Sequence, residues 1–178
     1  PPVTPAPPVT PAPTSIAFRF GTWNCQMPNL GGSSDWKSRA AFVHDTMRVS
    51  VLAVQECSEA GRDAFRAALG KNWLTYPLST SQTVALLWDS SKYQHRDPRR
   101  HSLGTRYHGG IAVPLIPKGF TVGFDAVSYH GPVRGTLADK RLALANTRKS
   151  IVKSWPTIFA GDTNMNDPVL SGFSPATP

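Results

Sequence analysis

The amino-acid sequence predicts a mixed α/β (α+β) domain, in which helices flank a sheet or a pair of packed sheets. Two observations support this prediction. Strand and helix periodicities alternate through the first half of the chain, and a section rich in hairpin signals then leads to a last helix and strand. The chain has 178 residues, of which 40% are hydrophobic, so it is long enough to bury one substantial core.

The first 14 residues, PPVTPAPPVTPAPT, differ in composition from the rest of the chain. Proline fixes φ and removes backbone donors, so residues 1–14 are predicted to form an extended linker ahead of a domain over residues 15–178. Such linkers tether domains in exported or virion proteins, so we expect an exported, secreted or virion-associated protein, with assembly partners reached through the linker. The chain begins with proline, which suggests a processed chain or a fragment.

Apolar spacing defines the elements of the first half. Trp36, Ala40, Val43 and Met47 recur at helical spacing. The expected elements are a strand over Ile16–Asn24, a loop over Gln26–Ser34, a helix from Asp35 to about Met47, a buried strand over Val49–Gln55, a helix over Glu59–Leu69 that Ser58 caps and Gly70 ends, and a strand over Thr83–Trp88.

In the second half of the chain, the sequence predicts a hairpin followed by a long helix and a short strand. A long helix there is expected to place Leu137, Leu144, Ile151 and Trp155 on one face. The expected elements are a turn over Asp89–Lys92, a basic loop over Gln94–His108, strands over Gly110–Ile116 and Phe120–His130 joined by Pro117-Lys118-Gly119, a helix from Thr136 to about Trp155, a short buried strand over Ile158–Ala160, and a loop over Asn166–Pro178.

The net charge and the cysteine content limit which partners and which metals are expected. The net charge of +8 favours a polyanionic partner, of which nucleic acid is the commonest, although phosphoinositide head groups or a cell wall also fit. No apolar run is long enough to form a transmembrane segment. Cys25 and Cys57 form no zinc pattern, so a bound metal would be a hard cation held by oxygens. The two cysteines are expected to be buried free thiols, with a disulfide between neighbouring strands as the alternative.

The stretch Ile158-Phe159-Ala160-Gly161-Asp162-Thr163-Asn164 carries the strongest site signal. A short apolar strand ends at a glycine, and a carboxylate and an amide follow two residues apart, where an extended backbone would point both to one side. Open α/β sheets usually bind ligands just past such strand ends. The same residues are also typical of a plain turn, and the stretch alone does not separate a ligand site from a turn.

Three other predicted strands also end in polar residues suited to phosphate chemistry. Glu56 directly follows the apolar run that ends at Gln55, and such a carboxylate needs a partner, of which a cation is one. His130 closes another apolar strand and could supply or stabilise a proton. Asn24 closes the first strand. Each residue has a structural explanation by itself, but all of them in this order indicate one common site.

The order of these residues resembles the endonuclease/exonuclease/phosphatase superfamily, which has the deoxyribonuclease I-like fold. The motifs that carry the resemblance are Asn24, Gln55-Glu56, Ser128-x-His130 and Gly161-Asp162-x-Asn164. Within the superfamily, Thr22-Trp23-Asn24-x-Gln26, Trp36 and Val54-Gln55-Glu56 look most like the cytolethal distending toxin B subunit. The resemblance spans about residues 16–173 and implies a two-layer β-sandwich flanked by helices, in α/β/β/α order.

The resemblance also implies hydrolysis of phosphodiesters or phosphomonoesters that depends on a divalent metal, Mg²⁺ or else Mn²⁺ or Ca²⁺. The roles that it implies are metal binding by Glu56 with help from Asn24, orientation of the attacking water by Asp162, contact with the phosphate or that water by Asn164, a position near the scissile phosphate for His130, and phosphate binding by Arg106 and Gln26.

The sequence departs from the family pattern at one point, and because of this departure three functions remain possible. Family members continue to a strand that carries an Asp-His pair, and none follows Asn164 before Pro178. The sequence is therefore expected to be a fragment or a degenerate domain with weak or no hydrolysis. The retained site residues favour a DNA endonuclease. The missing pair favours a binding or structural module for DNA, a cell surface or an assembly partner. A phosphoinositide phosphatase would share the site.

Overall fold

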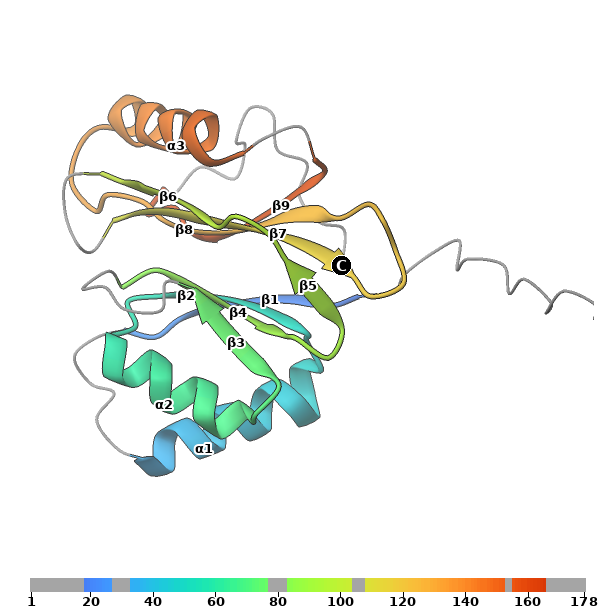
Figure 1. Cartoon of the computed structure of the whole chain (residues 1–178). Helices are drawn as coiled ribbons and strands as arrows, with labels where there is room; N and C mark the ends of the chain where they lie inside the picture. The colour runs from blue at the N-terminus through green and yellow to red at the C-terminus, as the bar shows by residue number, and fades with distance from the viewer. Residues whose placement is uncertain (1–17, 27–32, 77–82, 104–107, 153–154, 166–178) are drawn as a thin grey trace, which may run out of the picture.

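Two β-sheets pack face to face between two layers of helices in the computed structural model, which describes residues 18–26, 33–76, 83–103, 108–152 and 155–165 (Figure 1). The first sheet has the order β1-β2-β4-β3, and the second has the order β5-β7-β8-β9, with β6 also paired to β7. Helices α1 and α2 cover the first sheet and α3 covers the second (Figure 1). The predicted four-layer α/β/β/α arrangement is confirmed.

The element bounds are as follows. The strands are β1 (Phe20–Asn24), β2 (Val51–Gln55), β3 (Trp73–Tyr76), β4 (Ala85–Asp89), β5 (Tyr93–His95), β6 (Arg99–Ser102), β7 (Gly109–Pro117), β8 (Phe124–His130) and β9 (Thr157–Asp162). The helices are α1 (Ser33–Ala41), its π-helical continuation η1 (Phe42–Met47), α2 (Glu59–Leu69) and α3 (Leu137–Ile151). No helix in the described part of the chain is long and apolar enough to cross a membrane.

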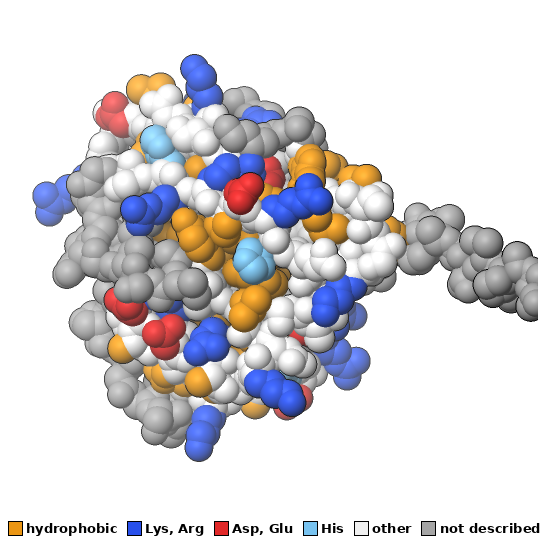
Figure 2. All heavy atoms as spheres, in the orientation of Figure 1, with side chains coloured by type: hydrophobic (Ala, Val, Ile, Leu, Met, Phe, Trp, Pro, Cys, Tyr) orange, Lys and Arg blue, Asp and Glu red, His pale blue; other side chains and the backbone are white. Residues whose placement is uncertain are grey.

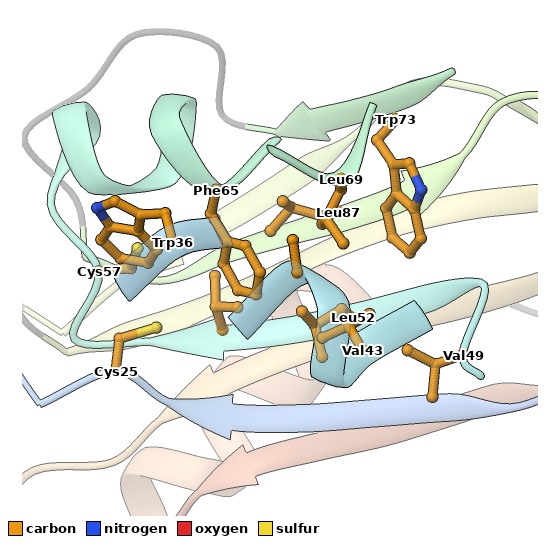
Figure 3. Packing of buried hydrophobic residues seen from close by; sticks show 13 residues of the cluster. Cys25, Trp36, Val43, Val49, Leu52, Cys57, Phe65, Leu69, Trp73 and Leu87 are labelled. Carbon is orange, nitrogen blue, oxygen red and sulfur yellow. The ribbon is translucent and has the colours of Figure 1, made fainter. Parts of the chain in front are cut away.

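Strand β2 contributes side chains to two hydrophobic clusters, one on each face of the first sheet. It is buried at every position, and its side chains alternate between the two faces of the first sheet. Leu52 and Val54 belong to the cluster beneath α1 and α2, which also contains Trp36 and Phe65. Figure 3 shows Leu52 next to Val43 in this cluster. Val51 and Ala53 instead pack in the cluster between the sheets. A continuous apolar run is therefore required, as the sequence predicted for a strand covered on both faces.

Capping residues fix where the two long helices begin. The Ser58 hydroxyl accepts a hydrogen bond from the Gly61 backbone N–H at the start of α2. At the start of α3, Thr136 and Asp139 form a reciprocal capping box, and the hydrogen bonds from Thr136 lower the pKa of the Asp139 carboxyl. Both helix starts agree with the sequence prediction.

Two parallel strand pairs, one in each sheet, bring four strand ends to the same pole of the sandwich. β1 runs parallel to β2, and β8 runs parallel to β9. The two sheets are joined near this pole, because Gln55 Nε2 donates to Ser128 Oγ at 2.9 Å and Ser128 Oγ donates to the Val54 carbonyl at 3.1 Å. Residues that follow β1, β2, β8 and β9 are therefore neighbours, although they are far apart in sequence.

The prediction of a basic loop over Gln94–His108 was wrong for two segments. Residues Tyr93–His95 form β5 and Arg99–Ser102 form β6, and both pair antiparallel with β7. Arg99 forms an ion pair with the buried Asp125 of β8, which explains why a cationic segment lies in a sheet. The four-residue strand β3 was not predicted.

Other boundaries also differ from the prediction. Helix α3 ends at Ile151, not near Trp155. Leu137 lies on the same helical face as Leu144 but is 42% exposed, so the buried part of this face does not reach the start of the helix. Strand β9 continues through Gly161 to Asp162 and is half-buried. The predicted linker over residues 1–14 and the loop over 166–178 lie outside the described residues.

The two cysteines are buried free thiols, as expected. Cys25 follows β1 and Cys57 follows β2, so the parallel pairing of these strands places the two cysteines next to each other (Figure 3). A hydrogen bond with Cys25, together with burial, raises the pKa of the Cys57 thiol far above its ordinary value. The Cys57 thiol therefore stays protonated at neutral pH, and both buried cysteines pack as small apolar side chains.

Candidate active site

Asn24 joins the two sheets at the centre of the site. Its side-chain Nδ2 donates to Glu56 Oε1 at 3.0 Å and to Asp162 Oδ2 at 2.9 Å. Its Oδ1 accepts a hydrogen bond from the Gln26 backbone N–H at 2.9 Å, which fixes the orientation of the amide. In this geometry Asn24 would support a metal ion by holding the two carboxylates, with its own oxygen turned toward Gln26.

His130 completes the cluster from the end of β8. Its Nε2 lies 3.5 Å from Glu56 Oε1, and its side chain is 3% exposed, whereas that of Glu56 is 30% exposed. One ligand atom from each of Glu56, His130 and Asp162 lies within 4.8 Å of the others. Two carboxylates brought this close repel each other unless positive charge lies between or beside them. Their oxygens are the donors that hard divalent cations prefer, so the residues present fit Mg²⁺, Mn²⁺ or Ca²⁺.

The segment after β9 is both a turn and part of the site. Asp162 Oδ1 accepts from the Asn164 backbone N–H at 2.8 Å, which is the side-chain turn that the Gly-Asp-Thr-Asn composition predicts. Asn164 Nδ2 donates to the Gly131 carbonyl at 2.8 Å, so the loop after β9 is fastened to the loop after β8. Because Asn164 has a positive φ, its side chain does not simply extend the direction of Asp162.

Left-handed backbone conformations concentrate at this pole. Within the described segments, the non-glycine residues with positive φ are Gln26, Arg48, Glu56 and Asn164. Three of these four, Gln26, Glu56 and Asn164, lie within two residues of the end of a strand that builds the site. Each such residue costs about 1 kcal/mol or more in an ordinary turn, and such strain is typical of functional sites, where it aims a side chain. At Glu56 the left-handed conformation turns the chain immediately after the buried β2.

A second histidine, which the sequence did not single out, lies against His130. The ring centroids of His108 and His130 are 4.9 Å apart. Burial is the main cause that lowers the pKa of His108, with a further contribution from His130, while Glu56 opposes them. His108 directly precedes Gly109, which pairs with His130 across β7 and β8. Only this register, which the sequence does not display, identifies His108 as a site residue.

Lys140 is a further residue that the sequence did not single out. Its Nζ donates to the Asn164 carbonyl at 2.6 Å, from the first turn of α3. The ammonium group therefore braces the loop after β9. From the sequence, Lys140 is visible only as a residue of the helix that begins at Thr136.

The two predicted phosphate-binding residues remain predictions. Gln26 is exposed at the rim of the site, where its backbone N–H is used by Asn24. Arg106 lies outside the described residues.

Comparisons with known proteins identify the family and the fold. The model of the Endonuclease/Exonuclease/phosphatase family matches residues 21–176. No curated protein matches the chain in a sequence comparison. The crystal structure of an endonuclease/exonuclease/phosphatase from Bacteroides vulgatus is similar, with a TM-score of 0.68 and 17% identity over 85% of this chain and 67% of that one.

Two further solved structures share the fold. D. rerio TDP2 complexed with a single-strand DNA product has a TM-score of 0.62 and 15% identity, over 82% of this chain and 60% of that one. The human Nocturnin catalytic domain with a bound sulfate anion has a TM-score of 0.60 and 18% identity, over 86% of this chain and 66% of that one. The chain thus spans 60% to 67% of the length of these three structures. The nearer likeness to the cytolethal distending toxin B subunit stays a prediction.

The family match covers most of the chain, and the described fold has the expected layers, with the motif residues gathered at one pole. The chain belongs to the Endonuclease/Exonuclease/phosphatase family, a superfamily of phosphoesterases and nucleases with the deoxyribonuclease I-like fold.

Proposed function

We propose that this chain provides the site of a divalent-metal-dependent phosphodiesterase, and that its reaction is endonucleolytic hydrolysis of DNA. One observation carries the proposal. Asn24, Glu56, His130 and Asp162 come from the ends of four strands in two sheets, and one amide nitrogen contacts both carboxylates. A structural role does not require two carboxylates and a buried histidine to share one small volume at a strained pole.

The proposed roles follow from the contacts. Glu56 and Asp162 would hold the ion, which supplies positive charge to a phosphate that gains negative charge during hydrolysis. Asp162, which accepts hydrogen bonds from Asn24 Nδ2 and from the Asn164 backbone N–H, would also orient the attacking water. His130 is held beside Glu56 and would donate to a phosphate oxygen. These roles would be complementary, because the ion and His130 would stabilise charge on the phosphate while Asp162 positions the water.

DNA is the proposed substrate for two reasons. The net charge of +8 favours a polyanion, and Lys and Arg side chains are spread over the face in Figure 2. D. rerio TDP2, which shares the fold, was solved with a single-strand DNA product. A binding module without catalysis and a phosphoinositide phosphatase are the competing functions.

A plasmid-nicking assay with Mg²⁺ tests the proposal. The unaltered chain is expected to convert supercoiled plasmid to the open circle. Glu56→Ala and His130→Ala are each expected to reduce the rate by about a hundredfold or more, because each removes a group that stabilises the developing charge. Glu59→Ala is the matched control, since it removes an exposed carboxylate at the start of α2, and it is expected to nick normally.

Two outcomes would contradict the nuclease. Equal nicking by all four proteins would assign the activity to a contaminant, and no nicking by any of them would favour the binding module. Release of phosphate from a soluble phosphoinositide, with loss of that release in Glu56→Ala and no nicking, would favour the phosphatase.

A further inference from the structure

A basic hollow lies at the pole of the sandwich opposite the candidate active site. Its volume is about 710 Å³, and it is bounded by the residues before β1 and β2, by the turn between β4 and β5, and by the turn after β7. Ser50 directly precedes β2 and Glu56 directly follows it, so a strand about 20 Å long separates the hollow from the candidate active site.

Four cationic side chains surround this hollow. They are Arg19, Arg48, Lys92 and Lys118, and no acidic side chain is among the described residues that line it. All four are exposed, and none of them forms an ion pair within the described part of the chain, whereas Arg99 elsewhere in the fold pairs with the buried Asp125. Converging positive charge around a concave surface raises the local concentration of anions.

Backbone hydrogen bonds hold the segments that carry these cations. The Ser50 N–H donates to the Arg19 carbonyl at 3.1 Å, and the Lys118 N–H donates to the Lys92 carbonyl at 2.8 Å. Arg48 has the left-handed conformation that ends η1, with φ of 51°. The hollow is therefore part of the framework of the two sheets and is not a gap between independent loops.

Two buried hydroxyl groups also line the hollow. Ser50 and Tyr93 are 4% and 3% exposed, and their oxygens are 3.0 Å apart. The pair has two protons and uses one in the bond between them, so the other proton can be donated to a bound anion. Burial raises the pKa of Tyr93, which keeps the phenol protonated at neutral pH.

Two aromatic side chains also line the hollow. Phe18 and Phe120 both line it. Phe18 stacks on Phe124 with centroids 4.8 Å apart, which uses one ring face, and the residue remains 36% exposed. Cations that follow a phosphate backbone, combined with accessible aromatic faces, are the features that bind single-stranded nucleic acid without reading its sequence.

We propose that this hollow is a second, non-catalytic site that binds a nucleotide unit of a single-stranded nucleic acid, with the phosphate among the four cations and the base against Phe18 or Phe120. The site would hold a strand away from the candidate active site. Its existence does not depend on hydrolysis, so it can be tested whether or not the chain nicks DNA.

The test measures binding of a short fluorescein-labelled oligothymidylate by fluorescence anisotropy, in Glu56→Ala protein so that cleavage cannot interfere. Adding Arg19→Ala and Lys118→Ala together is expected to weaken binding about tenfold. Two lost contacts to a single strand should also reduce the slope of log affinity against log salt by about 1.4. The control adds Lys37→Ala and Lys149→Ala, which remove the same charge from exposed positions on α1 and α3 and should change binding less than twofold.

A second variant separates a nucleotide from other anions. Phe120→Ala is expected to weaken binding of the oligothymidylate but not of inorganic pyrophosphate, because pyrophosphate has no base to stack. Equal weakening by the two charge-removing pairs would overturn the proposal in favour of general charge attraction. No weakening by the Arg19 and Lys118 pair would also overturn it. Binding of vesicles with anionic lipid that the oligothymidylate does not displace would indicate a membrane site instead.

Discussion

A polar side chain near the candidate active site, that of Tyr129, is buried without a hydrogen-bond partner among the described residues. Tyr129 lies between Ser128 and His130 in β8 and is fully buried. Its hydroxyl has no hydrogen-bond partner among the described residues, and burial raises its pKa to about 12. An unsatisfied buried hydroxyl is destabilising by about 1–3 kcal/mol, so this phenol does not contribute to stability through its oxygen. Its ring contact with Phe159, at 5.5 Å between centroids, explains why an aromatic residue is needed.

Tyr129→Phe is expected to leave the protein as stable as the original at pH 7, or more stable by about 1 kcal/mol. The original protein should lose stability as pH rises from 10 toward 12, because the phenol ionises in the unfolded chain while it stays protonated in the fold. Urea unfolding at a series of alkaline pH values measures this loss, and the variant should show a shallower decline. Burial also raises the pKa of Tyr93, so some decline should remain. Identical pH profiles would contradict the burial of the Tyr129 hydroxyl.

The elements differ in how readily the sequence reveals them. Helix α2 was predicted at both ends, because Ser58 and Gly70 are local signals that act within one turn. Strands β5 and β6 were not predicted, since they are short, polar and held mainly by pairing with β7. The same limit applies to the site. Glu56 and Asp162 were visible as polar residues after apolar strands, but His108 enters the site only through the register of β7 with β8.

Gly161, just before Asp162, allows the backbone of β9 to lie close to that of β8. It has φ of 148°, and a Cβ there would lie 1.9 Å from the Tyr129 carbonyl oxygen. Gly161→Ala is expected to lower the free energy of unfolding by about 2–3 kcal/mol and to displace Asp162. Gly119→Ala is the control, because Gly119 also has positive φ but a Cβ would contact nothing within 4 Å, so only about 1 kcal/mol should be lost. Chemical denaturation of both variants measures the difference, and equal losses would refute the steric explanation.

The whole molecule depends on how the two sheets are joined, because half of the candidate site comes from each. Gln55 and Ser128 form the buried link between them, with Thr22 Oγ1 donating to Gln55 Oε1 at 3.3 Å on the other side. The sequence showed Gln55 and Ser128 as parts of two motifs. It could not show that they contact each other, because that contact needs the packing of one sheet on the other.

Ser128→Ala is expected to destabilise the fold by about 1–3 kcal/mol, because the buried Gln55 amide loses its acceptor. Adding Gln55→Leu should recover part of this loss, since replacement of both partners by apolar side chains leaves fewer unsatisfied groups. Thermal unfolding of the two single variants and the double variant measures this coupling. A double variant that loses the sum of the single losses would contradict a direct bond between the sheets.

Titration of Mn²⁺ followed by electron paramagnetic resonance tests most directly whether the two sheets build one cation site. The original chain is expected to bind one Mn²⁺, and Glu56→Gln and Asp162→Asn should each weaken binding by about tenfold, which is ~1.4 kcal/mol. The double variant should lose clearly less than the two losses added together, because both carboxylates would hold the same ion. Glu59→Gln should bind as the original does. Binding that is indifferent to Glu56 and Asp162, or losses that simply add, would contradict a shared metal site.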